Sequence, residues 1–168
     1  YGIDYKRVTA DELKGLFGLP TAQIIDIIIP DEPEERRREF EPLSYKYEDE
    51  YINRESGKLY DKMTETIAKL SEKYPLFIVS NCQGGYIELM LEKTGMKQYF
   101  KDYTCPAYAG MLKADNIKLI AERNGLKAPM YIGDTQMDAN ACKEAGVPIV
   151  FAAYGCGSCD NPDYTIES

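Results

Sequence analysis

Two aspartates in one segment of the chain have the spacing of cation ligands. Asp134 and Asp138 lie four residues apart, after a short apolar run at 130–132 that is typical of a buried strand. A helix is predicted from Gln136 to a stop at Gly146. Ligands of parallel α/β sheets bind just outside the carboxyl ends of the strands. Oxygen ligands in a chain without histidine favour Mg²⁺ over zinc. In the alternative interpretation, Asp134 caps the helix and Asp138 is a solvated helix carboxylate.

Three further residues have the chemistry of a phosphate site. Ser80 and Asn81 follow the apolar run 76–79, and Lys113 lies at the start of a later helix. A serine hydroxyl can cradle phosphate oxygens, a lysine adds positive charge, and Mg²⁺ can bridge a carboxylate to a phosphoryl oxygen. Phosphoryl transfer needs this kind of positioning and charge neutralisation. Alternatively, Ser80 is a helix N-cap and Lys113 a solvated cation.

Composition excludes several classes of function. The net charge of −8 and the pI near 4.7 argue against nucleic-acid binding. We expect the run Arg36–Arg38, flanked by glutamates, to be a solvated helix face. Without a signal peptide or a long apolar stretch, the chain is expected to be cytoplasmic, with no membrane partner. The lack of histidine excludes Ser-His-Asp and Cys-His catalysis.

The five cysteines show no disulfide rhythm, which favours free thiols in a reducing compartment. Cys156 and Cys159 have the C-x-x-C spacing of metal and redox sites. They lack a second pair and the helix that a redox motif opens, so the pattern disfavours both roles.

The chain divides into two parts by its patterning. Residues 1–59 are predicted to be helical, with a capping box at Thr9 and Glu12 and a helix that ends at Gly18. Asp26 is predicted to be a helix residue rather than a catalytic aspartate at a strand end. From residue 60 onward, strands are expected at 76–79, 103–105, 130–132 and 147–152, with helices between them. This alternation predicts an α/β fold with a parallel sheet.

Together these residues resemble the haloacid dehalogenase-like superfamily, in its phosphoglycolate-phosphatase-like branch. The segment 77–81 looks like its second motif, and Lys113 looks like the lysine of the third, with Ala114 where proline is frequent. The segment 132–138 is similar to the fourth motif, whose aspartates serve Mg²⁺. The resemblance implies that Ser80, Asn81 and Lys113 bind the phosphoryl group. It implies further that Asp134 is the direct metal ligand, and that Asp138 acts through water or by orienting the lysine.

The resemblance also implies an architecture and an activity. Residues 60–168 would form a Rossmann-like parallel-sheet core, incomplete at the N-terminus and at a terminal helix, and residues 1–59 a small all-helical cap. The activity implied is that of a Mg²⁺-dependent phosphatase acting on a small phosphorylated metabolite through an aspartyl-phosphate, as a monomer or weak homodimer.

One motif of the family has no counterpart in this sequence. The family's nucleophile and general acid lie in an Asp-x-Asp-x-Thr motif at the end of a central strand, and no such segment occurs here. We expect it before Tyr1, on a strand between those that carry Ser80 and Asp134.

Two alternatives to the phosphatase stay open, and a third is disfavoured. A naturally complete chain would be an inactive pseudo-phosphatase or a binding module. A phosphomutase would keep the same site. Dehalogenation is disfavoured, because halide displacement has no use for a metal-type aspartate pair.

Overall fold

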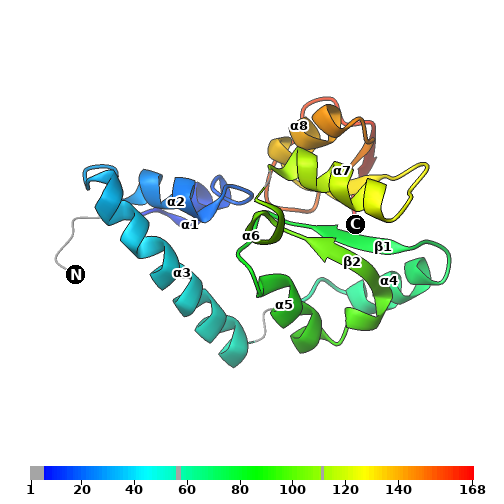
Figure 1. Ribbon diagram of the computed structural model, residues 1–168, viewed down its shortest axis with the longest axis horizontal. Coiled ribbons are helices and arrows are strands. Elements are labelled where there is room, and N and C mark those ends of the chain that lie inside the picture. The colour runs from blue at the N-terminus through cyan, green and yellow to red at the C-terminus, as the bar shows by residue number, and fades with distance from the viewer. Residues whose placement is uncertain (1–5, 56–57, 111) are drawn as a thin grey trace.

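The computed structural model describes residues 6–55, 58–110 and 112–168 (Figure 1). Three helices form an arm on one side, and an α/β unit follows. Residues 1–5 and 56–57 of the predicted helical segment lie outside the described residues. Within the described ranges, no helix is both long enough and apolar enough to span a bilayer.

The arm consists of α1 (Ala10–Lys14), α2 (Thr21–Ile28) and α3 (Glu34–Glu55). The predicted capping box is present, since Thr9 Oγ1 accepts from the Glu12 amide and the Glu12 carboxylate accepts from the Thr9 amide. Helix α1 ends at Lys14, with Gly15 as its C-cap, rather than at Gly18, because the hydrogen bonds of residues 16–19 are those of turns.

Asp26 lies in α2, as predicted, and ties α2 to α3. Arg37 Nε donates to Asp26 Oδ1 at 2.7 Å, and Arg38 Nη2 donates to Asp26 Oδ2 at 2.7 Å. The prediction of a solvated basic face is therefore wrong for Arg37 and Arg38. Each guanidinium reaches back across the helix pair to a carboxylate that would otherwise lie unpaired at the α2–α3 contact.

The α/β unit begins with α4 and ends with β5. Its elements are α4 (Met63–Ser71), β1 (Leu76–Val79), α5 (Tyr86–Thr94), η1 (Lys97–Tyr99), β2 (Phe100–Thr104), α6 (Pro106–Ala109), α7 (Lys113–Arg123), β3 (Tyr131–Gly133), α8 (Gln136–Ala145), β4 (Ile149–Ala152) and β5 (Tyr164–Ile166). The strands pair in parallel, which confirms the predicted class. Strand β2 starts earlier than predicted, and β5 was not predicted.

The strands form two separate ladders. Strand β1 pairs with β2, and β3 pairs with β4, which pairs with β5. Among the described residues, β1 and β3 share no ladder hydrogen bonds. Strand β1 therefore has a partner strand at one edge only among the described residues. All four residues of β1 are half-buried.

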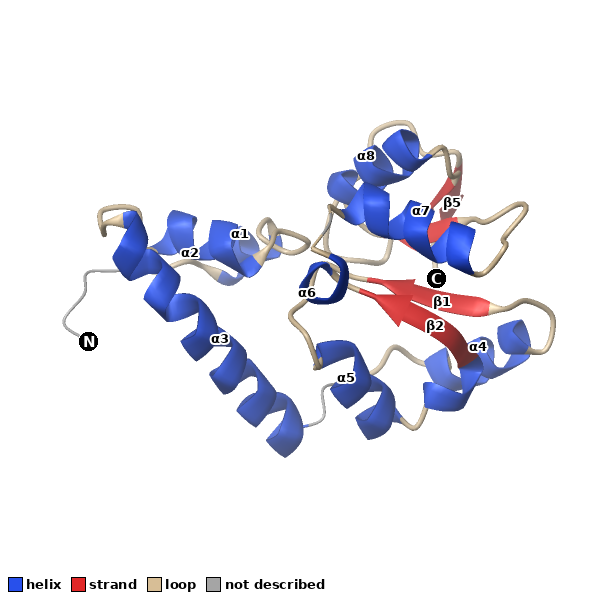
Figure 2. Cartoon of the chain, viewed as in Figure 1, coloured by secondary structure: helices blue, strands red, loops and turns tan. Residues whose placement is uncertain are grey.

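Helices cover the ladders in two layers (Figure 2). Helices α7 and α8 pack together on one side, over β1 and β4. Helices α4 and α5 lie on the opposite side of β1 and β2. The first layer buries Ile117, Cys142 and Ile149, and the second buries Ile87 and Leu91. These two cores hold the strand ends, and the residues that follow them, in fixed positions.

Candidate functional site

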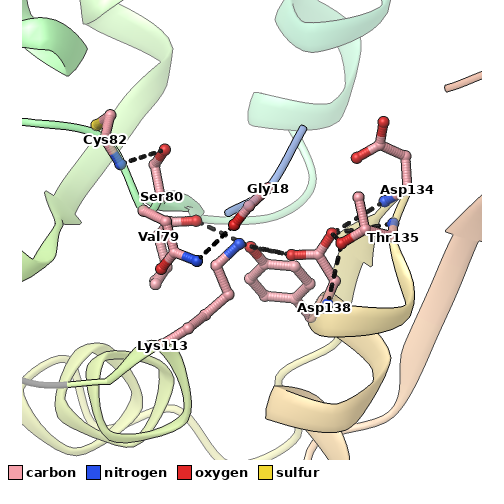
Figure 3. Close-up of polar contacts among 10 residues, drawn as sticks. Gly18, Val79, Ser80, Cys82, Lys113, Asp134, Thr135 and Asp138 are labelled. Atoms are coloured by element: carbon pink, nitrogen blue, oxygen red, sulfur yellow. Dashed lines mark hydrogen bonds and ion pairs between the residues drawn. The ribbon is translucent and has the colours of Figure 1, made fainter. Parts of the chain in front are cut away.

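The strand ends bring the predicted residues to one region (Figure 3). Ser80 follows β1, Asp134 follows β3, and Lys113 is the first residue of α7, as predicted. Lys113 Nζ lies 2.7 Å from Asp138 Oδ1. The Lys113 side chain is 12% exposed and that of Asp138 is 6% exposed. The alternatives that made each of them a solvated surface charge are therefore wrong.

Asp138 is the most hydrogen-bonded residue of the site. Its Oδ2 accepts from Thr135 Oγ1 at 2.7 Å, from the Thr135 amide at 3.1 Å and from the Asp134 amide at 3.3 Å. Burial by itself raises the pKa of Asp138, but the Lys113 charge and the hydrogen bonds from Lys113 and Thr135 outweigh it and lower that pKa below its ordinary value. Asp138 therefore stays ionised and fixes the position of the Lys113 ammonium.

Thr135, rather than Asp134, caps helix α8. Thr135 Oγ1 accepts from the Asp138 amide at 3.2 Å, which completes a capping box with the Asp138 side chain. The alternative that assigned the cap to Asp134 is wrong. The spacing of Thr135 and Asp138 is that of a capping box with aspartate in place of glutamate, so the sequence contained a signal for this contact.

Tyr131 is a site residue that no pattern in the sequence indicated. Its hydroxyl donates to the Val79 carbonyl oxygen at 2.8 Å and lies 3.5 Å from Asp138 Oδ1. The side chain therefore spans from β3 to β1. Burial, and then the charge of Asp138, raise the Tyr131 pKa well above its ordinary value, so the phenol stays neutral and can donate.

Ser80 and Asn81 connect the site to its surroundings. Ser80 Oγ accepts from the Cys82 amide at 3.3 Å, and α5 begins only at Tyr86, so Ser80 does not cap that helix. Asn81 Nδ2 donates to the Gly18 carbonyl oxygen at 3.0 Å, which brings the turn between α1 and α2 to the site (Figure 3). That turn also lies against Thr135, since a Cβ on Gly18 would lie 3.3 Å from Thr135 Cγ2.

Asp134 has a different orientation from Asp138. Its carboxylate points away from the Lys113–Asp138 pair (Figure 3) and accepts from the Cys156 amide at 2.8 Å. The described residues contain no group of three or more histidine, cysteine, aspartate or glutamate side chains placed to hold a metal ion. Because both Asp138 oxygens already accept hydrogen bonds, Asp134 fits a direct ligand better than Asp138 does. The donor chemistry at this strand end, oxygen alone, fits Mg²⁺.

Comparisons with solved structures give the same fold. A haloacid dehalogenase-like family hydrolase from Streptococcus pneumoniae superposes with a TM-score of 0.83 at 19% identity, covering 97% of this chain and 79% of that one. A "predicted phosphoglycolate phosphatase" from Haemophilus somnus gives 0.84 at 19% identity, covering 98% and 81%. The hydrolase YfnB from Bacillus subtilis, described as bound to magnesium, gives 0.64 at 19% identity, covering 96% and 69%.

The sequence itself identifies the family. Among curated proteins, no match was found. The sequence profile of the haloacid dehalogenase-like hydrolases, in contrast, matches residues 2–152, which is most of the chain. The order of the predicted motifs and the parallel α/β fold agree with that match. The chain therefore belongs to the haloacid dehalogenase-like hydrolase family.

Proposed function

We propose that this protein is a Mg²⁺-dependent phosphatase that hydrolyses a small phosphorylated metabolite through an aspartyl-phosphate. The observation that carries the proposal is the buried pair of Lys113 and Asp138 beside the carboxyl ends of β1 and β3. Taking two charges out of water costs several kcal/mol per ion, which the attraction between them offsets only with good geometry and further hydrogen bonds. A lysine held in this way is suited to binding the negatively charged oxygens of a phosphoryl group.

Each residue has a distinct role in this proposal. The Ser80 hydroxyl and the Lys113 ammonium bind oxygens of the transferred phosphoryl group, and Asp138 holds the ammonium in place. Asp134 would hold Mg²⁺, which when bound supplies positive charge to the phosphoryl oxygens. The Asn81 side chain donates to the Gly18 carbonyl oxygen and so connects the site to the helical part of the chain. The role of that part as a cap over the site belongs to the same proposal.

The nucleophile is proposed to lie on a strand between β1 and β3. Both strands have an edge without a ladder partner among the described residues, and β3 leaves Ile132 57% exposed. Asp26 cannot take the part, because two arginines hold its carboxylate in α2. An Asp-x-Asp segment on such a strand would deliver the nucleophile beside Ser80 and Asp134.

Phosphate release tests this proposal. The protein that includes the Asp-x-Asp strand is incubated with a panel of phosphorylated sugars, glycolates and nucleotides, with Mg²⁺ or with a chelator. Turnover that needs Mg²⁺, together with an acid-stable, hydroxylamine-sensitive phosphoenzyme, supports the phosphatase. Phosphoenzyme that transfers its phosphoryl group to a second sugar position rather than to water would indicate a phosphomutase. Ligand binding without turnover in that protein would contradict the proposal in favour of a binding module.

A further inference from the structure

The loop that follows β4 makes close backbone contacts with Asp134. The Cys156 amide donates to Asp134 Oδ2 at 2.8 Å. A Cβ on Gly155 would overlap the Asp134 side chain, lying 2.5 Å from its Oδ2, and a Cβ on Gly157 would lie 2.6 Å from the Asp134 carbonyl oxygen. The close approach therefore requires glycine at both positions. Neither glycine has a φ angle in the left-handed region. The requirement for glycine therefore comes from the contact with residue 134 and not from the backbone conformation.

The loop is fixed at both of its ends. At its start, the Ala153 amide donates to the Ile166 carbonyl oxygen at 2.9 Å, and the Tyr154 ring packs edge-on against Tyr60 at 5.3 Å between ring centroids. Toward its end, the Asp160 amide donates to Gln136 Oε1 at 2.6 Å. These contacts hold the Cys156 amide at one place relative to the first residues of α8. The loop is thus a fixed neighbour of Asp134.

We propose that the backbone of Gly155–Gly157 is a positioning element for Asp134, in which the Cys156 amide orients the carboxylate for the cation. This inference rests on the proposed function and deepens it. The amide engages Oδ2 alone, which leaves Oδ1 for a metal ion. Hydrogen bonds that orient a ligating group in this way are worth about 10- to 100-fold in metal affinity. The thiol of Cys156 takes no part, because the donor is the main chain.

Calorimetric titration with MgCl₂ tests the inference, using the protein that includes the Asp-x-Asp strand. Gly155→Ala is expected to weaken Mg²⁺ binding by about 10- to 100-fold, because the added methyl group displaces the Asp134 carboxylate from the amide. Gly15→Ala is the matched control, since its φ of −66° is ordinary and the new Cβ would be 3.3 Å from its nearest neighbour. Cys156→Ser is the second control, because it changes the thiol and keeps the amide. Both controls are expected to bind as the wild type does.

Amide hydrogen exchange provides a second readout that needs no glycine variant. The Cys156 side chain is exposed, yet its amide is expected to exchange slowly in the wild type and at least tenfold faster in Asp134→Ala. Equal exchange rates in those two proteins would overturn the inference, even if Gly155→Ala fails to fold. Wild-type Mg²⁺ affinity in folded Gly155→Ala would overturn it as well. A wild type that binds no Mg²⁺ would instead contradict both the metal part of the proposed function and the orienting role toward it.

Discussion

Lys113 and Asp138 form an ion pair of 2.7 Å between the first turn of α7 and the first turn of α8. The two helices pack side by side, and the pair joins them although β3 separates them in the sequence. Tyr131 adds a hydroxyl 3.5 Å from the same carboxylate oxygen. Asp138 thus links α7 to α8, and Tyr131 extends the contact to the Val79 carbonyl oxygen in β1.

Removing the lysine charge is expected to abolish most activity. In the protein that includes the Asp-x-Asp strand, Lys113→Ala is expected to lower kcat/KM by about two orders of magnitude or more, the usual effect of losing one charge-stabilising donor. Lys118→Ala is the control, because Lys118 lies on the same helix and is 41% exposed. Steady-state phosphate release measures both variants. Wild-type turnover in Lys113→Ala would contradict its role.

Breaking the pair from the other side is expected to destabilise the fold. Asp138→Asn leaves the Lys113 ammonium buried without its counter-charge, and losing one partner of a buried pair costs about 3–5 kcal/mol. Asp115→Asn is the control, because Asp115 is 47% exposed and lies 3.9 Å from Lys118, so the loss there is expected to stay below about 1 kcal/mol. Urea unfolding at pH 7 compares the two. Equal losses would mean that the pair adds nothing.

Acid is expected to remove the same stabilisation. The pKa of Asp138 is lower in the folded protein than in the unfolded chain, where it is about 3.9. Its contribution to the free energy of unfolding is therefore present above pH 4 and lost as the pH falls through the folded-state pKa. The difference in stability between wild type and Asp138→Asn should shrink over that range. A difference that stays constant from pH 7 to pH 3 would contradict this assignment.

Asp134 is expected to carry most of the Mg²⁺ affinity. Asp134→Asn removes the negative charge that the cation needs, so calorimetry should show binding weakened by about tenfold or more. Losing even a residue that only orients a metal ligand has an effect of that size. Asp160→Asn, an exposed carboxylate in the loop after β4, is the control. Unchanged affinity in Asp134→Asn would remove the metal assignment.

The thiols are expected to differ in reactivity. Denatured protein without reductant should contain five free thiols, and a count of three or fewer would contradict this. In the folded protein Cys156 should be alkylated first, because it is exposed. Cys105 and Cys142 are fully buried, and burial raises the pKa of Cys142 to about 12, so both should react only after unfolding. Mass spectrometry of the labelled peptides measures the order in which the cysteines are alkylated.

Much of the fold was predictable because its signals are local. Apolar runs bounded by proline, glycine and polar residues predicted β1, β3 and β4 and the helices between them, and a capping box predicted the start of α1. Strand β5 was missed because Tyr164–Ile166 has only three residues and little burial to produce a pattern.

The sequence by itself determined the chemistry available, which consists of Ser80, Lys113, Asp134 and Asp138 in the order of a phosphoryl-transfer family, with no histidine. Only the tertiary structure decided that Asp138 holds the lysine while Asp134 turns toward the Cys156 amide. It also decided that Tyr131 spans from β3 to β1. These contacts join residues that are up to 52 positions apart. They depend on how helices and strands pack against each other, and hydrophobic periodicity records which face of an element is buried but not which residue it meets there.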